Sequence, residues 1–490
     1  MIAWTFISAL IGSVVLLLLP SERRALARWV ALGTAGTGFA AALVAFCLFD
    51  RSASAAPFQF VFEREWIPSL GIGFHLGADG ISLVLLLLTG LIAITGILFS
   101  WNIERSPNRF FALFLIIIAG AYGVFLSTDV FLLIVFYEIV ILPKYLLIAG
   151  WGSTNKSYGA MKLTLYSIVG SALALAAIIA TYVVAGQSSF DLFTLAGADY
   201  PVAFQVWAFP LMFVGFAILA GMWPFHTWAP TGHVAAPTAG SMLLAGLVMK
   251  LGAYGALRVA MPLFPEGLAQ WQGIFAALAA FSILYGALAA LAQRDLKFVI
   301  GYSSISHMGF VMLGLMTLSL IGVSGAVLQM VSHGIIAALL FGVAGRMIYD
   351  RTHTRNLDEL GRLGLARKLP FAAVAFLIAS VASMGLPGFS GFVAELTVLL
   401  GTLDDSPRLL LIVGPAIILT GAFTLKAMQA TFFSDGPLER DPPLNLITLP
   451  EKMGAGLLIA ATLIVGLWPM PFLNLILRSF DSPLMRVLFE

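Results

Sequence analysis

The sequence predicts an all-α polytopic membrane protein with about fourteen transmembrane helices. Of its 490 residues, 60% are hydrophobic and only 10% are charged, and the mean hydropathy is +1.00. Soluble domains carry about 25% charged residues. The apolar segments are long enough for a helix to cross a bilayer, and they lack the alternation of polar and apolar residues that marks β-barrel strands. The net charge of +2 is too small to suggest nucleic acid as a partner.

Fourteen segments qualify as spans in a single membrane domain over residues 1–490. They run over residues 2–20, 27–48, 79–101, 110–127, 129–150, 162–186, 205–223, 237–261, 271–292, 298–319, 322–348, 369–400, 408–433 and 454–477. The first is expected to be a spanning helix and not a removed signal peptide, because no basic residues precede it and no clear cleavage site follows. The longest connections, 49–78 and 434–453, are predicted to be loops.

Basic residues collect on one side of the predicted membrane. With the N-terminus outside, seventeen lysines and arginines lie in or beside cytoplasmic loops and six lie on the opposite face. This is the positive-inside pattern, and it predicts that both termini lie on the outer, periplasmic side of a bacterial inner membrane. The seventeen are Arg23, Arg24, Arg28, Arg105, Arg109, Lys156, Lys162, Arg294, Lys297, Arg346, Arg351, Arg355, Arg362, Arg367, Lys368, Arg440 and Lys452, and the six are Arg51, Arg64, Arg258, Arg408, Arg478 and Arg486.

Subtracting these seventeen and six from the 26 basic residues leaves three within spans, Lys144, Lys250 and Lys426. Two acids, Glu138 and Glu395, also lie within spans. A charge at bilayer depth costs at least ~2.5–3.5 kcal/mol, so such residues usually face a protein interior or a wet cavity. Glu138 and Lys250 are the strongest functional candidates, because each lies far inside an apolar run. Lys144 and Lys426 lie nearer span ends, where a lysine can also extend to the membrane surface.

Two histidines, His307 and His333, lie in the polar-flanked patches YSSISHMG and QMVSHG. Histidine exchanges a proton near neutral pH, which favours a role in proton transfer over a purely hydrogen-bonded core position. No Cys/His cluster, HExxH motif, glycine-rich phosphate loop or dinucleotide fingerprint is present in the sequence. We therefore expect no metal and no redox cofactor in this chain.

Two spans are interrupted. The seventh runs into WPFHTWAPTGHVAAPTAG, and the twelfth contains SMGLPGFSGFVAE. Prolines and glycines at this density break helices, and broken helices persist in membranes where protein or water satisfies the freed carbonyls. Because the two breaks lie five spans apart, two five-helix units would have inverted topology, as in ion-translocating proteins. The alternative is that both are ordinary proline kinks.

Several stretches resemble the antiporter-like membrane subunits of respiratory complex I. These are FYEIVILPKYLLIAGWG, PFHTWAPTGHVAAPTAGSMLLAGLVMKLGAYGALR, RDLKFVIGYSSISHMGFV, HTRNLDELGRLG and GLPGFSGFVAEL. The resemblance covers most of the chain, and the last two stretches are typical of the M-type subunits of bacterial NADH:quinone oxidoreductase.

The resemblance implies two inverted repeats, spans 4–8 (residues 110–261) and spans 9–13 (residues 271–433), with proton translocation along a central polar axis. It implies that Glu138 is the key acid of the fifth span, Lys250 the central lysine of the eighth, and Glu395 the terminal acid of the twelfth. His307 and His333 match axis positions of the tenth and eleventh spans, with Lys144, Lys426 and Lys297 as accessory candidates.

The resemblance also implies partners and an energy source outside this chain. The expected neighbours are L-, N- and K-type membrane subunits in the lipid bilayer. NADH, FMN, iron–sulfur clusters and quinone are expected in partner subunits, so this chain meets quinone only indirectly. Quinone reduction in a neighbouring module would supply the energy for proton movement.

The chain departs from the family pattern at four positions, so a divergent or duplicated M-type copy is expected. The usual lysine of the seventh span aligns with Leu219, and the usual aspartate after Trp-x-Pro is Thr231. Lys144 and Lys426 stand where apolar residues are expected. A nearby cation lowers the pKa of a buried carboxylate. We therefore expect Lys144 to point into the bundle, toward the seventh span, and to replace the displaced charge through water.

Two other functions fit the same sequence. One is the D-type subunit of a multisubunit Na⁺/H⁺ antiporter, which is a secondary transporter without redox coupling. The other is a membrane scaffold with reduced transport, since Leu219 removes one member of the family's ion pair. A scaffold predicts that Glu138 and Lys250 tolerate substitution.

Overall fold

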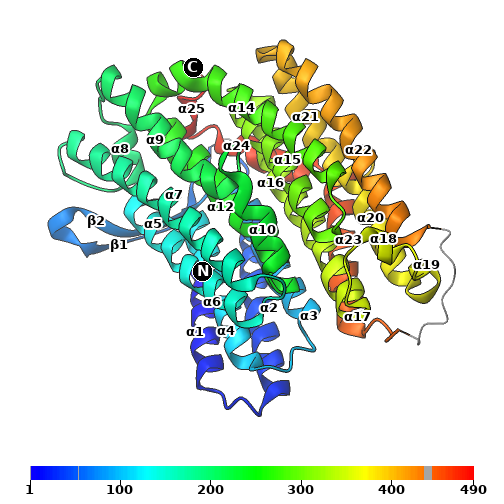
Figure 1. Cartoon of the computed structure of the whole chain (residues 1–490). Coiled ribbons are helices and arrows are strands. Elements are labelled where there is room, and N and C mark those ends of the chain that lie inside the picture. Colours follow the sequence, from blue (N-terminus) through cyan, green and yellow to red (C-terminus); the bar gives the residue numbers. More distant parts are fainter. Residues whose placement is uncertain (1, 53, 435–443, 490) are drawn as a thin grey trace.

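The computed structural model describes residues 2–52, 54–434 and 444–489, and it shows a bundle of long helices with a β-hairpin at its side (Figure 1). Of the charges counted above, Arg440 lies outside the described residues. The first part of the chain forms α1 (Trp4–Leu18), α2 (Arg24–Leu48), β1 (Gln59–Ile67), η1 (Pro68–Leu70), β2 (Ile72–Ala78), α3 (Gly80–Phe99), α4 (Pro107–Leu126), α5 (Val130–Ile139), α6 (Ile141–Trp151), α7 (Lys156–Val184), α8 (Leu192–Ala196), α9 (Val202–Ala220), η2 (Phe225–Thr227) and α10 (Trp228–Ala235).

The second part of the chain continues the bundle and ends in two shorter helices. Its elements are α11 (Thr238–Leu243), η3 (Leu244–Val248), α12 (Met249–Gly255), η4 (Ala256–Ala260), α13 (Met261–Leu263), α14 (Pro265–Ala292), α15 (Leu296–Met316), α16 (Leu320–Phe341), η5 (Gly342–Tyr349), α17 (Asp350–Thr352), α18 (Leu357–Leu360), α19 (Leu365–Lys368), α20 (Pro370–Ser383), α21 (Ser390–Asp405), η6 (Pro407–Leu409), α22 (Leu410–Phe432), α23 (Leu449–Leu467), α24 (Met470–Ser479) and α25 (Pro483–Arg486).

The prediction of an all-α polytopic membrane protein is confirmed. Twelve helical segments in the described residues are long and apolar enough to cross a membrane. Two shorter apolar helices, α1 and α20, lie where the first and twelfth spans are predicted. The count of fourteen spans and the inverted repeats stay predictions.

The eighth and eleventh predicted spans lie at the centre of the bundle. The apolar windows of Thr238–Leu263 and Leu320–Thr352 are 100% buried, whereas those of α2 and α22 are 28% buried. A helix that is apolar on all sides suits both lipid and protein surroundings, so this central position follows from packing and not from hydropathy. Polar side chains on the two central spans are therefore shielded from lipid.

Both predicted helix interruptions are present. α9 ends at Ala220, where Gly221 has a φ of +79°, and the helical path resumes at η2 and α10. α20 ends at Ser383, where Gly385 has a φ of +72°, and the path resumes at α21. Glycine adopts this left-handed conformation without a Cβ clash, which lets the chain leave each helix sharply.

The predicted fifth span, 129–150, is two helices and not one. α5 ends at Ile139 and α6 begins at Ile141, with Val140 between them. Pro143 has no N–H to donate to the carbonyl of Ile139, and its ring crowds that carbonyl. The break four residues before the proline follows from that lost bond.

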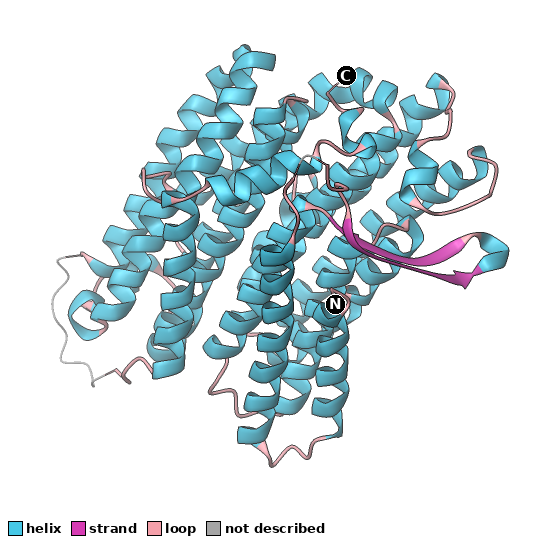
Figure 2. Cartoon of the chain, turned by 180° about the vertical axis from the view of Figure 1, so that it is seen from behind, coloured by secondary structure: helices cyan, strands magenta, loops and turns pink. Residues whose placement is uncertain are grey.

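The prediction of a plain loop over 49–78 is wrong, because this connection contains the antiparallel hairpin β1–β2, which projects from the bundle (Figure 2). Strand β2 is held close to the hairpin turn by Asp129, the N-cap of α5, whose carboxylate accepts hydrogen bonds from the backbone N–H groups of Gly73 and Leu132 at 2.9 Å each. The stretch QFVFEREW does not alternate apolar and polar residues strictly, so its sequence carries only a weak strand signal.

Candidate functional site

Lys250 lies at the centre of the bundle, on α12, and its side chain is fully buried (0% exposed). Its ammonium donates to the backbone carbonyl of Ala245, in the π-helical segment η3. Its Nζ also lies 2.7 Å from Nδ1 of His333 on α16. A π-helical segment displaces the usual i→i−4 bonding and often occurs at functional sites, and here it presents a carbonyl to the buried ammonium.

The close approach of α16 to η3 brings His333 within reach of Lys250. Gly334, the next residue on α16, faces the backbone of Gly246. A Cβ added to Gly334 would lie 2.9 Å from the Gly246 carbonyl oxygen, closer than real Cβ atoms lie. A glycine is therefore required at this crossing, and it sets the distance between the two helices.

His307 joins the tenth, eleventh and twelfth predicted spans. Its Nδ1 lies 3.0 Å from Oε1 of Glu395 on α21, and its Nε2 lies 3.0 Å from Oγ of Ser383 at the end of α20. Gln329 Nε2 donates to the same Glu395 oxygen at 3.3 Å. Both halves of the broken helix thus hold the histidine, one through Glu395 and the other through Ser383.

A continuous row of polar side chains connects these two groups. The ring centroids of His307 and His333 lie 5.6 Å apart. We name the following residues the central cluster: Lys250, His333, His307, Gln329, Glu395 and Ser383. All six side chains are buried, and Glu395 is the most exposed ionisable member, with 7% of its surface accessible. An amine, two imidazoles and a carboxylate in this order can hold and pass protons through the apolar bundle.

Glu138 does not lie inside the bundle. The sequence predicts a buried acid, but the Glu138 side chain on α5 is exposed on the surface of the chain. Neighbouring Leu142 is also exposed, at 63%. In the described part of the chain Glu138 has no hydrogen bond or ion pair. Hydropathy cannot distinguish a lipid-facing or subunit-facing surface from the core, because all three are apolar apart from the charge.

Lys144 points into the bundle, with 2% of its surface exposed. Its Nζ donates to Oγ of Ser167 on α7 at 3.2 Å, so it contacts the sixth predicted span and not the seventh. No ion pair joins Lys144 to Glu138 in the described residues. Leu219, which was expected to need a replacement charge, is also buried, at 2%.

The two other lysines differ from each other. Lys426 is exposed, and its Nζ donates at 2.8 Å to the carbonyl of Leu291 near the end of α14. This lysine satisfies a helix-end carbonyl and does not join the central cluster. Lys297 is buried at 2% exposure, and its Nζ donates at 3.1 Å to the carbonyl of Ala236, between α10 and α11.

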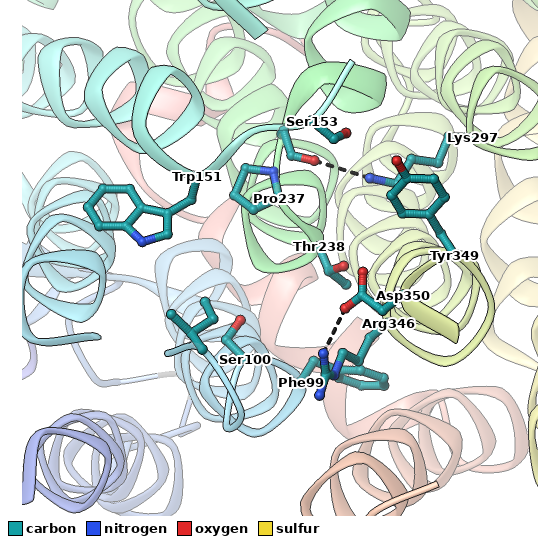
Figure 3. A pocket seen from close by; sticks show the side chains of 12 residues that line it. Phe99, Ser100, Trp151, Ser153, Pro237, Thr238, Lys297, Arg346, Tyr349 and Asp350 are labelled. Carbon is teal, nitrogen blue, oxygen red and sulfur yellow. Dashed lines mark hydrogen bonds and ion pairs between the residues drawn. The ribbon is translucent and has the colours of Figure 1, made fainter. Parts of the chain in front are cut away.

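Lys297 lines a cavity of about 180 Å³ (Figure 3). On one side are Ser153 and Pro237, and on the other is the pair of Arg346 and Asp350, whose Nη1 and Oδ2 atoms lie 2.7 Å apart. Its volume accommodates several water molecules. The cavity therefore places space for water beside a buried lysine at the break between α10 and α11.

His233 is a further buried histidine, on α10 just before the break, and the sequence analysis overlooked it. The ring is fully buried (0%), stacks on Phe341 at 4.9 Å, and neither nitrogen has a hydrogen-bond partner in the described residues. The sequence clue to it was the histidine in GHVAAP, within the predicted helix interruption. This histidine was overlooked because the prolines and glycines of that stretch were interpreted only as helix breakers.

A second overlooked feature is a buried ion pair. Arg258, at 1% exposure, was counted with the outer-face charges, but its Nη2 lies 2.6 Å from Oδ2 of Asp79. Asp79 is the N-cap of α3 and also accepts from Ser82 N at 2.9 Å. The pair ties α3 to η4. Arginine keeps its charge at all physiological pH values, so this pair suits anchoring and not proton transfer.

The chain matches the family model described as NADH:quinone oxidoreductase/Mrp antiporter, TM, over residues 127–420. This range includes every ionisable member of the central cluster, together with Glu138 and Lys144. No group of three or more potential metal-ligating side chains occurs among the residues that the structure describes.

Two relatives match along nearly the whole chain. NAD(P)H-quinone oxidoreductase chain 4 1 of Picosynechococcus sp. is 36% identical over 472 residues, covering 94% of this chain and 87% of that protein. NADH-quinone oxidoreductase subunit M of Rhodobacter capsulatus is 37% identical over 456 residues, covering 90% of this chain and 87% of that protein.

Two solved structures share the fold. A chain of respiratory complex I from Thermus thermophilus with bound NADH matches with a TM-score of 0.88 and 29% identity, covering 99% of this chain and 100% of that chain. A chain of the Mrp complex from Dietzia sp. matches with a TM-score of 0.87 and 23% identity, covering 100% of this chain and 99% of that chain. At 23% identity, the second match shows the fold alone.

Proposed function

This chain belongs to the family of NADH:quinone oxidoreductase and Mrp antiporter membrane subunits, and we propose that it is a proton-translocating subunit of an NADH:quinone oxidoreductase. The names of the relatives from Picosynechococcus sp. and Rhodobacter capsulatus support the oxidoreductase over the antiporter. The chain is one subunit of the enzyme complex and has no redox centre of its own. NADH, FMN, iron–sulfur clusters and quinone belong to partner subunits.

The central cluster carries this proposal. A pump needs ionisable groups that are shielded from water and close enough to exchange protons. Nζ of Lys250 lies 2.7 Å from His333, and His307 lies 3.0 Å from Glu395. A structural role does not require four ionisable groups in one buried row, because each of them costs free energy at this depth.

The cavity beside Lys297 is the proposed access route from the cytoplasmic side. In this route, water in the cavity exchanges protons with Lys297, the buried His233 passes them to Lys250, and the row continues to Glu395. Because Glu395 lies next to the break between α20 and α21, the freed backbone groups there can guide a proton outward. The orientation with both termini on the periplasmic side of a bacterial inner membrane is supported by the positive-inside pattern.

The exposed Glu138 supports a neighbouring subunit at α5. A bare carboxylate facing lipid at this depth is costly, so a partner that covers α5 and offers a hydrogen-bond donor or a cation is favoured. We propose that an L-, N- or K-type membrane subunit covers α5 and supplies this donor or cation. A change in the charge that the partner presents to Glu138 would transmit the energy of quinone reduction to this chain.

A Na⁺/H⁺ antiporter subunit is the second candidate, because the family description and the shared fold with the Mrp complex both include it. Purification from native membranes through a tag on this chain distinguishes the two. We expect co-purifying subunits that bind quinone and iron–sulfur clusters, and NADH-driven proton uptake into liposomes without Na⁺. Co-purification with small antiporter subunits alone, and Na⁺-dependent transport without NADH, would overturn the proposal.

A further inference from the structure

We propose that Lys144 is a proton-carrying residue that connects the surface acid Glu138 with the central cluster. This inference rests on the proposed function and deepens it, because it assigns a role in proton transfer to a buried lysine outside the central cluster. The observations that support it are the burial of the ammonium, its weak hydrogen bonding, its place beside the eighth predicted span, and the break between α5 and α6.

The first observation is a buried ammonium with a single hydrogen bond. Lys144 is 2% exposed, and its one bonded partner is Oγ of Ser167 at 3.2 Å. The Ser167 hydroxyl in turn donates to the carbonyl of Leu163 at 2.8 Å. No carboxylate contacts Lys144 among the described residues. A lysine that only anchors helices would be expected to have an acid or several carbonyls around it, as a buried charge needs full hydrogen bonding.

The buried arginine provides the contrast. Arg258 is equally buried, and its guanidinium contacts Asp79 directly, with Nη2 2.6 Å from Oδ2. That pair is neutral as a whole and fixed in position. Lys144 has three N–H donors and one serine acceptor, so its charged form is poorly compensated in this site. A group in such a site can lose its proton and remain buried as a neutral amine.

The third observation is the position of Lys144 against the eighth predicted span. Lys144 lines a small cavity with Gly240, Leu243 and Leu244, and the cavity measures about 10 Å³. That is the smallest space that holds one water molecule, and Lys144 is the one charged residue in a lining that is otherwise apolar. Leu244 directly precedes Ala245, whose carbonyl accepts from the Lys250 ammonium. The cavity thus adjoins the stretch of backbone that holds the first member of the central cluster.

The predicted fifth span is broken at Val140, and it carries one ionisable side chain at the surface and another in the interior. Along a straight helix, six residues turn ~600°, which leaves Glu138 and Lys144 on different faces. Glu138 is exposed and Lys144 is buried. Although they do not touch, six residues along a helix advance only ~9 Å, and charges at that separation interact across a low-dielectric bundle. A partner that neutralises Glu138 therefore changes how strongly Lys144 holds its proton.

The proposed step is a proton transfer in which only N–H and O–H bonds change. The Lys144 ammonium gives one proton to a water molecule in the adjoining cavity, and the water passes a proton toward Lys250. Lys144 becomes a neutral amine and is protonated again from the Glu138 side through the Ser167 hydroxyl or water. Each cycle therefore moves one proton and leaves the lysine unchanged.

The test compares variants of the complete complex in inverted membrane vesicles, with NADH oxidation, proton uptake and complex content measured together. Lys144→Met removes the proton carrier and relieves the buried charge. We expect normal complex content and at least about a fivefold loss of proton uptake. Lys144→Arg keeps the charge but holds its proton, so it should pump no better than Lys144→Met. Lys426→Met, which removes an exposed lysine bonded to a backbone carbonyl, is the matched control and should pump normally.

A second substitution distinguishes loss of the proton carrier from misfolding, because a misfolded complex would not regain proton uptake when a lysine is added elsewhere. Leu219 is buried, and its carbonyl carbon lies next to Gly252 on α12. A lysine at this position enters the core beside the helix of Lys250. We expect Leu219→Lys to restore part of the proton uptake in the Lys144→Met background. If Lys144→Met pumps normally, or if Lys144→Arg restores full pumping, the inference is overturned. If the wild-type complex itself does not couple NADH oxidation to proton uptake, the proposed function fails instead.

Discussion

Every ionisable side chain of the central cluster adjoins another, whereas in the region of Glu138 none touches another ionisable side chain. The links around His307 measure 3.0 Å to Glu395 and 3.0 Å to Ser383. Glu138 has no hydrogen-bond partner in the described residues, and Lys144 has only the hydroxyl of Ser167. The two regions lie in the same bundle, and Lys250 even shares the first predicted repeat with Glu138 and Lys144, yet one region is connected and the other is open.

This difference indicates where movement and water are needed. In the proposed path, a proton would cross the central cluster through hydrogen bonds and one short gap between two imidazole rings. Near Glu138 it has to pass through water, or the side chains have to move, because no protein contact connects the acid to the lysine. The open region is therefore the suitable place for control by a neighbouring subunit, since small changes there make or break the path.

The largest expected effect on pumping comes from Glu395→Gln, which preserves size and removes the carboxylate that accepts from His307 and Gln329. We expect proton uptake to fall at least about 100-fold with the complex still assembled, because a positioned acid–base group typically contributes at least that factor. Proton uptake per NADH measured in liposomes decides this. Wild-type proton uptake in this variant would show that Glu395 does not carry protons. The central cluster would then not be a connected proton path.

The next effect is Glu138→Gln, for which we expect about a tenfold loss of both NADH oxidation and proton uptake, as typical for the loss of a coupling between two sites. The two activities fall together because the acid transmits a signal and does not simply carry protons. If proton uptake falls while NADH oxidation stays normal, Glu138 is an ordinary carrier and the two regions are more alike than their contacts indicate.

A smaller effect is expected for Ser383→Ala, which removes one hydrogen bond from His307. Such a bond typically contributes ~1 kcal/mol, so proton uptake should fall about fivefold. Ser390→Ala is the matched control, since Ser390 lies across the same helix break and bonds Ser332 at 2.8 Å outside the cluster. Equal losses in both variants would assign the effect to the broken helix and not to the histidine.

No loss of pumping per assembled complex is expected for Arg258→Met. This change leaves Asp79 as a buried, unpaired charge, so it should destabilise the chain by about 3–5 kcal/mol. Thermal unfolding of the purified complex measures the stability, and proton uptake is normalised to complex content. The double variant Asp79→Asn with Arg258→Met should recover much of the stability. A pumping defect in that stable double variant would show that buried charge outside the central cluster also carries protons.

The sequence predicted which ionisable residues lie in the interior of spans, and the structure shows which of them point toward one another. Lys250, His307, His333 and Glu395 were predicted from charge or imidazole inside apolar spans, and the structure brings all four together. Their mutual contacts could not be predicted, because the rotation of each helix depends on packing. The π-helical segment η3, for example, changes the direction of the residues that follow it and has no clear sequence signal.

Glu138 shows the opposite limit. Its span is as apolar as the central ones, but the acid lies on the surface of the chain. In a membrane, hydropathy separates spans from loops and cannot separate the core from a surface that meets lipid or another subunit. The inward direction of Lys144 was predictable in part, since a ~120° offset from Glu138 on a helix puts the two on different faces. Its serine partner on α7 was not, because it depends on how two helices pack.

The central claim is that the buried row carries protons and does not merely hold charge, and Lys250→Arg tests it most directly. Arginine keeps the positive charge next to His333 but does not release its proton. The measurement is proton uptake per NADH oxidised in liposomes containing the assembled complex, with Lys250→Met as the uncharged control. We expect both variants to lose at least about tenfold in proton uptake relative to wild type. A wild-type ratio in Lys250→Arg would contradict the account, because positive charge alone would then suffice at the centre of the row.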